Sequence, residues 1–144
     1  MPNKKIELKS KEDEILLGID FGKTNIGIAF GRNTYTQPLK NISGINQNEA
    51  IREISRIALE NRVDKIIMGL PLTADNKETD MSLETRRFAK LLKIHLKKPI
   101  VFVNEYRTSK SALEASINMG ISQKDRRSID HISAALILKC YYDR

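Results

Sequence analysis

Apolar and polar positions along the chain follow the periods of strands and helices and divide it into short elements. Apolar runs that end at turn residues are typical of buried strands, and apolar residues repeated every three to four positions are typical of helices. We predict strands over residues 15–20, 25–30, 34–37, 63–68 and 99–103. We predict helices over residues 48–61, 81–96, 109–118 and 128–142.

The order of these elements predicts the fold class. The first strands follow one another closely and form hairpins, with Pro38 expected to stop the third strand. The later strands alternate with helices, which is typical of parallel β-α-β units. A loop is expected to begin at Gly69, because Leu70 precedes Pro71 and such a residue favours extended backbone. We therefore predict an α/β fold with a mixed sheet flanked by helices on both faces.

Three acidic residues occupy positions that suit a shared site. Asp20 and Glu105 each stand at the carboxyl end of a predicted strand, and Asp130 stands in the first turn of the last predicted helix. Sites in open α/β sheets form at the carboxyl ends of strands. Helical spacing also places Asp130 on the face of the helix that suits packing against the sheet. We expect the three carboxylates to converge and to bind Mg²⁺ or Mn²⁺, which removes their mutual repulsion. Two such ions roughly 4 Å apart support hydrolysis of a phosphodiester.

Each acid alone also has an ordinary structural explanation. Asp20 is a residue type common in hairpin turns, and Glu105 fits a solvated strand end. Asp130 fits the first turn of a helix, where the helix dipole favours a negative charge and Ser128 can cap the N-terminus. Spacing alone therefore leaves the metal site as a hypothesis.

Length, charge and cysteine content limit the class of protein. The chain has 144 residues, which fits one domain; we expect a flexible tail over residues 1–14 and the domain over residues 15–144. Its 25 Lys and Arg against 18 Asp and Glu give a net charge of +7, which favours a polyanionic partner. Cys140 is the one cysteine, so no internal disulfide forms. With no signal peptide and no long apolar run, we expect a cytoplasmic protein without a membrane partner.

Basic residues gather in two places. The first group brackets Glu105 and Asp130 or lies in the turn after Asp20, and it is expected to position substrate phosphates without reading bases. Its predicted nucleic-acid-binding residues are Lys23, Arg107, Thr108, Lys110, Lys124, Arg126 and Arg127. The second group is a stripe on the 81–96 helix and just after it, formed by Arg86, Lys90, Lys93 and Lys97. We interpret this stripe as a solvated helix face, with binding of a phosphate backbone as the alternative. Aromatic residues are only 6% of the chain and Trp is absent, which disfavours a base-stacking RNA reader.

Four segments, in this order and spacing, resemble the YqgF family of pre-16S rRNA nucleases, whose members are also described as Holliday junction resolvases. They are GIDFGKTNIGIA at 18–29, IIMGLPL at 66–72, NEYRTS at 104–109 and SIDHISAALIL at 128–138. The resemblance implies a ribonuclease H-like fold with a five-stranded mixed sheet. It also implies a divalent-metal nuclease that matures the 5′ end of ribosomal RNA. The acidic residues of the family carry over onto Asp20, Glu105 and Asp130.

The chain also departs from the family pattern. Asn104 and Tyr106 stand where the family usually has Asp and Arg, and Asn25 stands where it often has Arg or Ser. Four functions therefore stay open: a nuclease acting on structured RNA, a resolvase acting on branched DNA, a small-molecule phosphotransferase and a non-catalytic RNA-binding assembly factor. Sugar kinases share the ribonuclease H-like core but need two copies of it around their nucleotide. The phosphotransferase is therefore disfavoured, because 144 residues supply one core. The sequence leaves a monomer and a homodimer equally open.

Overall fold

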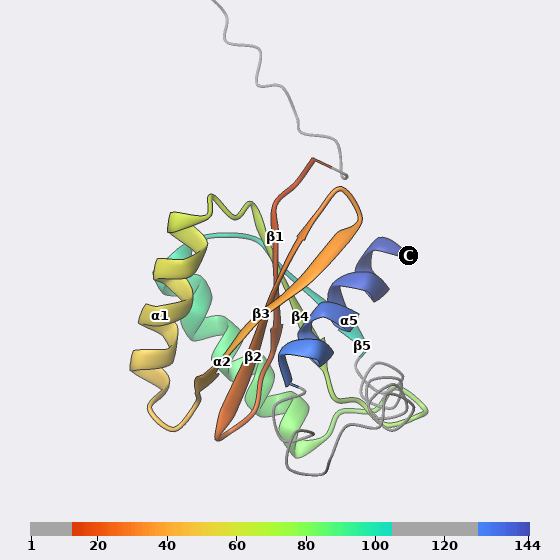
Figure 1. The fold of residues 1–144 in the computed structure, drawn as a ribbon. Helices are drawn as coiled ribbons and strands as arrows, with labels where there is room; N and C mark the ends of the chain where they lie inside the picture. Colours follow the sequence, from red (N-terminus) through yellow and green to blue (C-terminus); the bar gives the residue numbers. More distant parts are fainter. Residues whose placement is uncertain (1–12, 105–129) are drawn as a thin grey trace, which may run out of the picture.

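The computed structural model describes residues 13–104 and 130–144 and shows an α/β arrangement (Figure 1). The strands are β1 (Leu16–Asp20), β2 (Asn25–Arg32), β3 (Tyr35–Ser43), β4 (Lys65–Leu70) and β5 (Ile100–Asn104). The helices are α1 (Gln47–Glu60), α2 (Asp80–Leu96) and α5 (Asp130–Tyr142). The predicted helix over residues 109–118 lies outside the described residues.

The strands form one five-stranded mixed sheet in the order β3-β2-β1-β4-β5. β1, β2 and β3 pair antiparallel, whereas β1, β4 and β5 pair parallel. The carboxyl ends of the three parallel strands therefore lie at one edge of the sheet, the lower edge in Figure 1. α1 and α2 cover one face and α5 lies on the other. This arrangement confirms the predicted mixed sheet with helices on both faces.

The alternation of side chains along β1 supplies both hydrophobic cores. Leu17 and Ile19 point into the core under α1 and α2, and Leu16 points into the core under α5. The α5 core also contains the helix positions that the sequence assigned to the packed face. These are Ala134, Ile137, Leu138 and Tyr141, all buried. The last helix is thus fixed on the sheet by the face that the sequence predicts.

Two strands run past the ends that the sequence predicts from proline. β3 continues through Pro38 to Ser43, because it is an edge strand, where proline is tolerated. Its register against β2 also shifts between Ile28 and Ala29, and Pro38 is paired with Ala29. β4 continues to Leu70, since the extended backbone favoured before a proline is also the backbone of a strand. Both differences concern where a strand ends.

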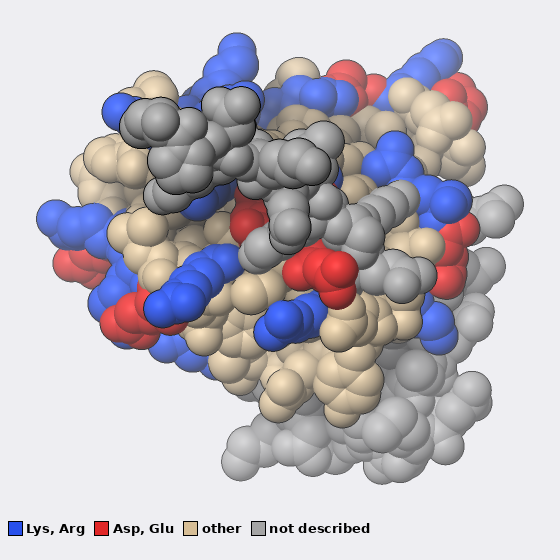
Figure 2. All heavy atoms as spheres, turned by 90° about the horizontal axis from the view of Figure 1, so that it is seen from above, with Lys and Arg blue, Asp and Glu red and all other residues tan. Residues whose placement is uncertain are grey.

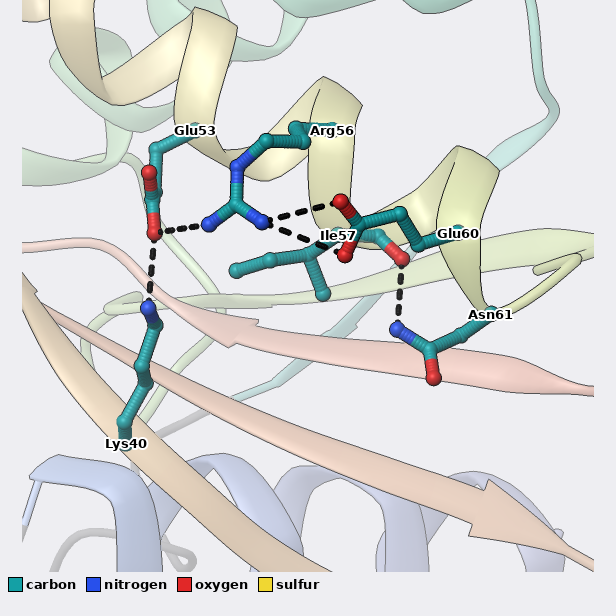
Figure 3. Close-up of polar contacts among 6 residues, drawn as sticks. All are labelled: Lys40, Glu53, Arg56, Ile57, Glu60 and Asn61. Carbon is teal, nitrogen blue, oxygen red and sulfur yellow. Dashed lines mark hydrogen bonds and ion pairs between the residues drawn. The ribbon is translucent and has the colours of Figure 1, made fainter.

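A chain of ion pairs joins β3 to α1 (Figure 3). Lys40 Nζ lies 2.6 Å from Glu53 Oε1, and Arg56 Nη2 donates to the same oxygen at 2.8 Å. Arg56 Nη1 lies 3.0 Å from Glu60 Oε1. The hydrogen bond from Lys40 lowers the pKa of the Glu53 carboxyl, with a further contribution from Arg56. All of these side chains are partly or fully solvent-exposed, so the chain adds little stability.

Replacing Glu53 with glutamine is expected to lower the urea midpoint at neutral pH by about 0.3 M, the scale of an exposed ion pair. Because the pKa of Glu53 is lower in the folded state, its contribution is present above the unfolded pKa and is lost as pH falls through the folded pKa. The difference between the two proteins should therefore be smaller at pH 3, which lies below the usual pKa of Glu of about 4.3, than at neutral pH. Urea titrations at both pH values test this. An equal difference at both would show that Glu53 acts through packing.

Candidate active site at the carboxyl ends of the parallel strands

Asp20 is the last residue of β1 and stands at the edge where the parallel strands end. It is half-buried, and alternation places it on the same face of the sheet as Leu16 and Gly18, the face that α5 covers. Its partner in β2 is Gly27. On the other side, Ile19 pairs with Met68, so Gly69 comes level with Asp20 in β4. Asp20 is thus flanked by glycines on both neighbouring strands.

β5 brings a second predicted position to the same edge. Gly69 of β4 pairs with Val103, and Leu70 pairs with Asn104, the last residue of β5. Neighbouring strands lie about 4.8 Å apart, so β1 and β5, with β4 between them, are separated by about 10 Å. Glu105 follows Asn104 directly in the sequence and lies outside the described residues. The strand that leads to Glu105 therefore ends at the same edge as β1, with β4 between the two.

The third predicted position is set by the way α5 rests on β1. A Cβ on Gly18 would lie 2.7 Å from both Ala134 O and Leu138 Cγ, so only glycine lets the helix approach this closely. Gly31, the partner of Leu16 at the other end of β1, faces the hydroxyl of Tyr142 instead. α5 therefore runs antiparallel to β1, and its N-terminus lies toward Asp20.

Asp130 is the first residue of α5 and precedes Ala134 by one turn, about 6 Å along the helix axis. Because Ala134 rests on Gly18, this turn extends along β1 toward the strand end that carries Asp20. The backbone thus brings the start of α5, the end of β1 and the end of β5 to one edge. Among residues 13–104 and 130–144 there is no group of three His, Cys, Asp or Glu side chains that could hold a metal ion.

The turn after Asp20 is held tightly in place. Gly44 N donates to Thr24 O at 2.8 Å, and a Cβ on Gly44 would lie 2.6 Å from Gly22 O. Gly22 in turn has no room for a Cβ, because Asn25 O occupies that space. These contacts hold the backbone turn that follows Asp20.

Lys23 is the one predicted nucleic-acid-binding residue within the described part of the chain. It lies in this turn with its side chain 68% exposed, and its Nζ is 3.7 Å from Glu84 Oε1 at the first turns of α2. A contact this weak and exposed adds little stability. The other predicted residues lie outside the described residues: Arg107, Thr108, Lys110, Lys124, Arg126 and Arg127.

The sequence reasoning missed a contact that ties the loop after β4 to the end of β5. Asn104 Nδ2 donates to Asn76 Oδ1 at 2.7 Å. Asn76 has a φ of 62°, a left-handed backbone that asparagine tolerates better than most residues. The two residues are far apart in the sequence, and Asn76 in a polar loop carries no signal of its own. Asn104, which departs from the usual family residue, here serves as the anchor of this loop.

The end of the sheet opposite the carboxyl ends of the parallel strands carries both basic and acidic side chains. Figure 2 looks onto that end from above and shows Lys and Arg side chains interspersed with Asp and Glu. The excess positive charge of the chain therefore does not gather into a uniform basic surface there. In the described part of the chain, no helix has the length and apolar character needed to cross a membrane.

Comparison with known proteins agrees with this geometry. RuvC of Thermus thermophilus, solved in complex with a Holliday junction substrate, aligns with a TM-score of 0.58 at 12% identity, covering 91% of this chain and 95% of that one. At this identity the likeness concerns the fold alone, and it confirms the predicted ribonuclease H-like fold.

Sequence relatives and a family model cover most of the chain. A Mycoplasma mobile protein named "Putative pre-16S rRNA nuclease" is 40% identical over 126 residues, 85% of this chain and 87% of its own length. A Syntrophomonas wolfei protein of the same name is 33% identical over 133 residues, 89% of this chain and 93% of its own. The family model described as "RuvX: Holliday junction resolvase" matches residues 14–144. The chain therefore belongs to the RuvX family, also called YqgF.

Proposed function

We propose that this protein is a divalent-metal-dependent nuclease that processes the 5′ end of pre-16S ribosomal RNA in the cytoplasm. The observation that carries the proposal is the meeting of three backbone positions at one sheet edge: the end of β1 at Asp20, the end of β5 before Glu105 and the start of α5 at Asp130. The names of the sequence relatives supply the substrate class.

The chemistry of the donor set fits Mg²⁺ or Mn²⁺. Both ions prefer oxygen ligands, and all three proposed ligands, Asp20, Glu105 and Asp130, are carboxylates. Gly27 and Gly69, level with Asp20 on the neighbouring strands, contribute no side chains that compete for this position. When bound, such ions lower the pKa of water and stabilise the charge that develops on phosphate oxygens.

The residues of the chain hold and orient these participants. Asp20 sits on a rigid strand end between two packed glycine contacts, which keeps its carboxylate in a defined position. Lys23 and the proposed phosphate-binding side chains near Glu105 and Asp130 hold the substrate through its phosphates. Those further phosphate-binding residues are Arg107, Thr108, Lys110, Lys124, Arg126 and Arg127. Such contacts orient the backbone and leave recognition to the shape of the RNA.

The description of the family model favours one alternative, cleavage of four-way DNA junctions. The same three acids would serve that reaction, and the difference would lie in how the substrate is held. Cleavage at a junction needs two sites that act together, and therefore a homodimer. The proposed role of Asp20, Glu105 and Asp130 as metal ligands is the same for an RNA and for a DNA substrate.

A comparison of substrates tests the proposal. The protein is incubated with Mg²⁺ or Mn²⁺ and either a precursor 16S RNA that carries its 5′ leader or a four-way DNA junction of matched length. We expect cleavage in the RNA leader at least tenfold faster than cleavage of the DNA. The reverse preference would establish the resolvase activity instead. Binding of the RNA with no cleavage of either substrate would contradict both and support a non-catalytic assembly factor.

A further inference from the structure

A groove lies between α2 and the edge strand β5, on the face of the sheet away from α5. It has a volume of about 200 Å³, with Ala89, Ile100 and Phe102 as its apolar lining and Arg86, Lys90 and Lys93 as its basic lining. Ile100 and Phe102 are partly buried against the α1 and α2 core, and their remaining surface faces the groove. The basic stripe that the sequence suggested to be a solvated helix face thus borders an apolar cleft.

Arg86 lies at one end of this groove, and its side chain makes two contacts there. Its guanidinium carbon lies 5.3 Å from the centre of the Phe102 ring, a cation–π contact. Its Nε also donates to Glu78 Oε1, and this hydrogen bond lowers the pKa of the Glu78 carboxyl. Arg86 is therefore held over the ring by two partners, and its charge is partly balanced by Glu78.

Lys90 and Lys93 differ from Arg86 in that both are exposed and have no acidic partner within the described part of the chain. The sequence contains no Asp or Glu between Glu84 and Glu105, so this stretch of the chain carries only basic charged side chains. Two exposed ammonium groups beside an aromatic ring and an aliphatic floor match single-stranded nucleic acid. Its phosphates meet the two ammonium groups while a base packs against the apolar lining beside Arg86.

One end of the groove lies near the carboxyl end of β5, on the face of the sheet opposite the one that bears Asp20. Phe102 lies two residues before Asn104, about 7 Å from the carboxyl end of β5. α2 runs from that edge toward the other end of the sheet, so Arg86 lies nearer the edge and Lys93 further from it. From Arg86 to Lys93 the helix rises about 10 Å, which matches about three phosphates of one strand.

We propose that the groove formed by Arg86, Lys90, Lys93 and Phe102 binds a single-stranded segment of the RNA substrate, outside the catalytic edge. This proposal rests on the proposed function for the identity of the substrate, but not on its cleavage. The groove holds the strand that leads to or from the cleaved bond, so it increases affinity and sets which part of a precursor reaches Asp20. Packing of a base against the apolar lining tolerates different sequences, since every base offers an aromatic face.

Binding of a labelled oligouridine of about 12 nucleotides, in EDTA and over a range of salt concentrations, tests this proposal. Oligouridine is unstructured, and without divalent ions it is not cleaved. The variant with Lys90→Gln and Lys93→Gln should bind about tenfold more weakly at 0.15 M salt, and the slope of log affinity against log salt should decrease by about 1.4. Phe102→Leu should weaken binding about tenfold and leave the salt slope unchanged.

The matched control is the variant with Arg52→Gln and Lys139→Gln, which removes the same charge from exposed positions on α1 and α5. It should bind within about twofold of the wild type, once thermal unfolding shows all variants folded. Equal losses in the groove and control variants would show a general charge effect and overturn the proposal. A dimer that dissociates on Phe102→Leu, with oligouridine binding intact, would make this surface an interface between copies and also overturn it. Wild-type protein that binds oligouridine through the groove but cleaves no RNA would refute the proposed function alone.

Discussion

Replacing Asp20 with asparagine is expected to reduce cleavage of the precursor RNA by at least about a thousandfold, or ~4 kcal/mol of transition-state stabilisation. Asparagine keeps the size of the side chain and removes only its negative charge, so the strand end and the turn after it should stay folded. Without that charge, the site has one anionic ligand fewer for its ions. Initial rates of cleavage of a labelled 5′ leader, measured over a titration of Mg²⁺ and of Mn²⁺, provide the test.

The control for this variant is Asp143→Asn, which makes the same chemical change at an exposed position near the end of α5, far from the catalytic edge. Its rate should equal that of the wild type. EDTA should stop the wild-type reaction, and added Mg²⁺ should restore it. If the Asp20→Asn protein kept more than a tenth of the wild-type rate, Asp20 would not be a ligand and the proposed site would be wrong.

Replacing Gly18 with alanine should destabilise the protein by about 2–3 kcal/mol, the cost of inserting a methyl group into a packed core. The new Cβ would lie 2.7 Å from the backbone oxygen of Ala134, an atom that cannot move unless α5 moves with it. We also expect cleavage to fall further than the loss of folded protein explains, because a displaced α5 moves Asp130 away from Asp20. Urea unfolding gives the stability, and the cleavage rate per folded molecule gives the second effect.

Gly31→Ala is the matched comparison. Its Cβ would meet the hydroxyl of Tyr142 at 2.8 Å, the far end of a side chain close to the end of α5, which can rotate aside. Its cost should therefore stay below about 1 kcal/mol. If Gly31→Ala destabilised the protein as much as Gly18→Ala, the close approach of the helix at Gly18 would not be what fixes α5.

The sequence predicted the elements and one packed helix face, because these depend on local periodicity. Ala134, Ile137, Leu138 and Tyr141 repeat at helical spacing, and all are buried. It also placed Asp20 at a strand end, since an apolar run that stops at a carboxylate is a local signal. Pro38 misled the prediction of β3, because whether proline ends a strand depends on whether that strand is at the edge of the sheet.

Other features depend on residues that meet only in three dimensions. The contact of Arg86 with Phe102 and that of Asn76 with Asn104 join separate elements, and no periodicity in the sequence signals either. The same holds for the glycines beside Asp20: Gly27 and Gly69 come level with it only through the register of three strands. The stripe on α2 was visible in the sequence, but the groove beside it required β5 to be placed. The convergence of the side chains of Glu105 and Asp130 on Asp20 stays a prediction.

The position of α5 in the chain has a consequence for biosynthesis. Of the described elements, only α5 covers the sheet face that bears Leu16, Ile67 and Val103, and it follows every strand in chain order. A growing polypeptide can therefore pair its strands and bury the opposite face first, while this apolar surface remains open to water and to chaperones. In the proposed function, Asp130 joins Asp20 only after every strand has been synthesised, because it stands at the start of α5.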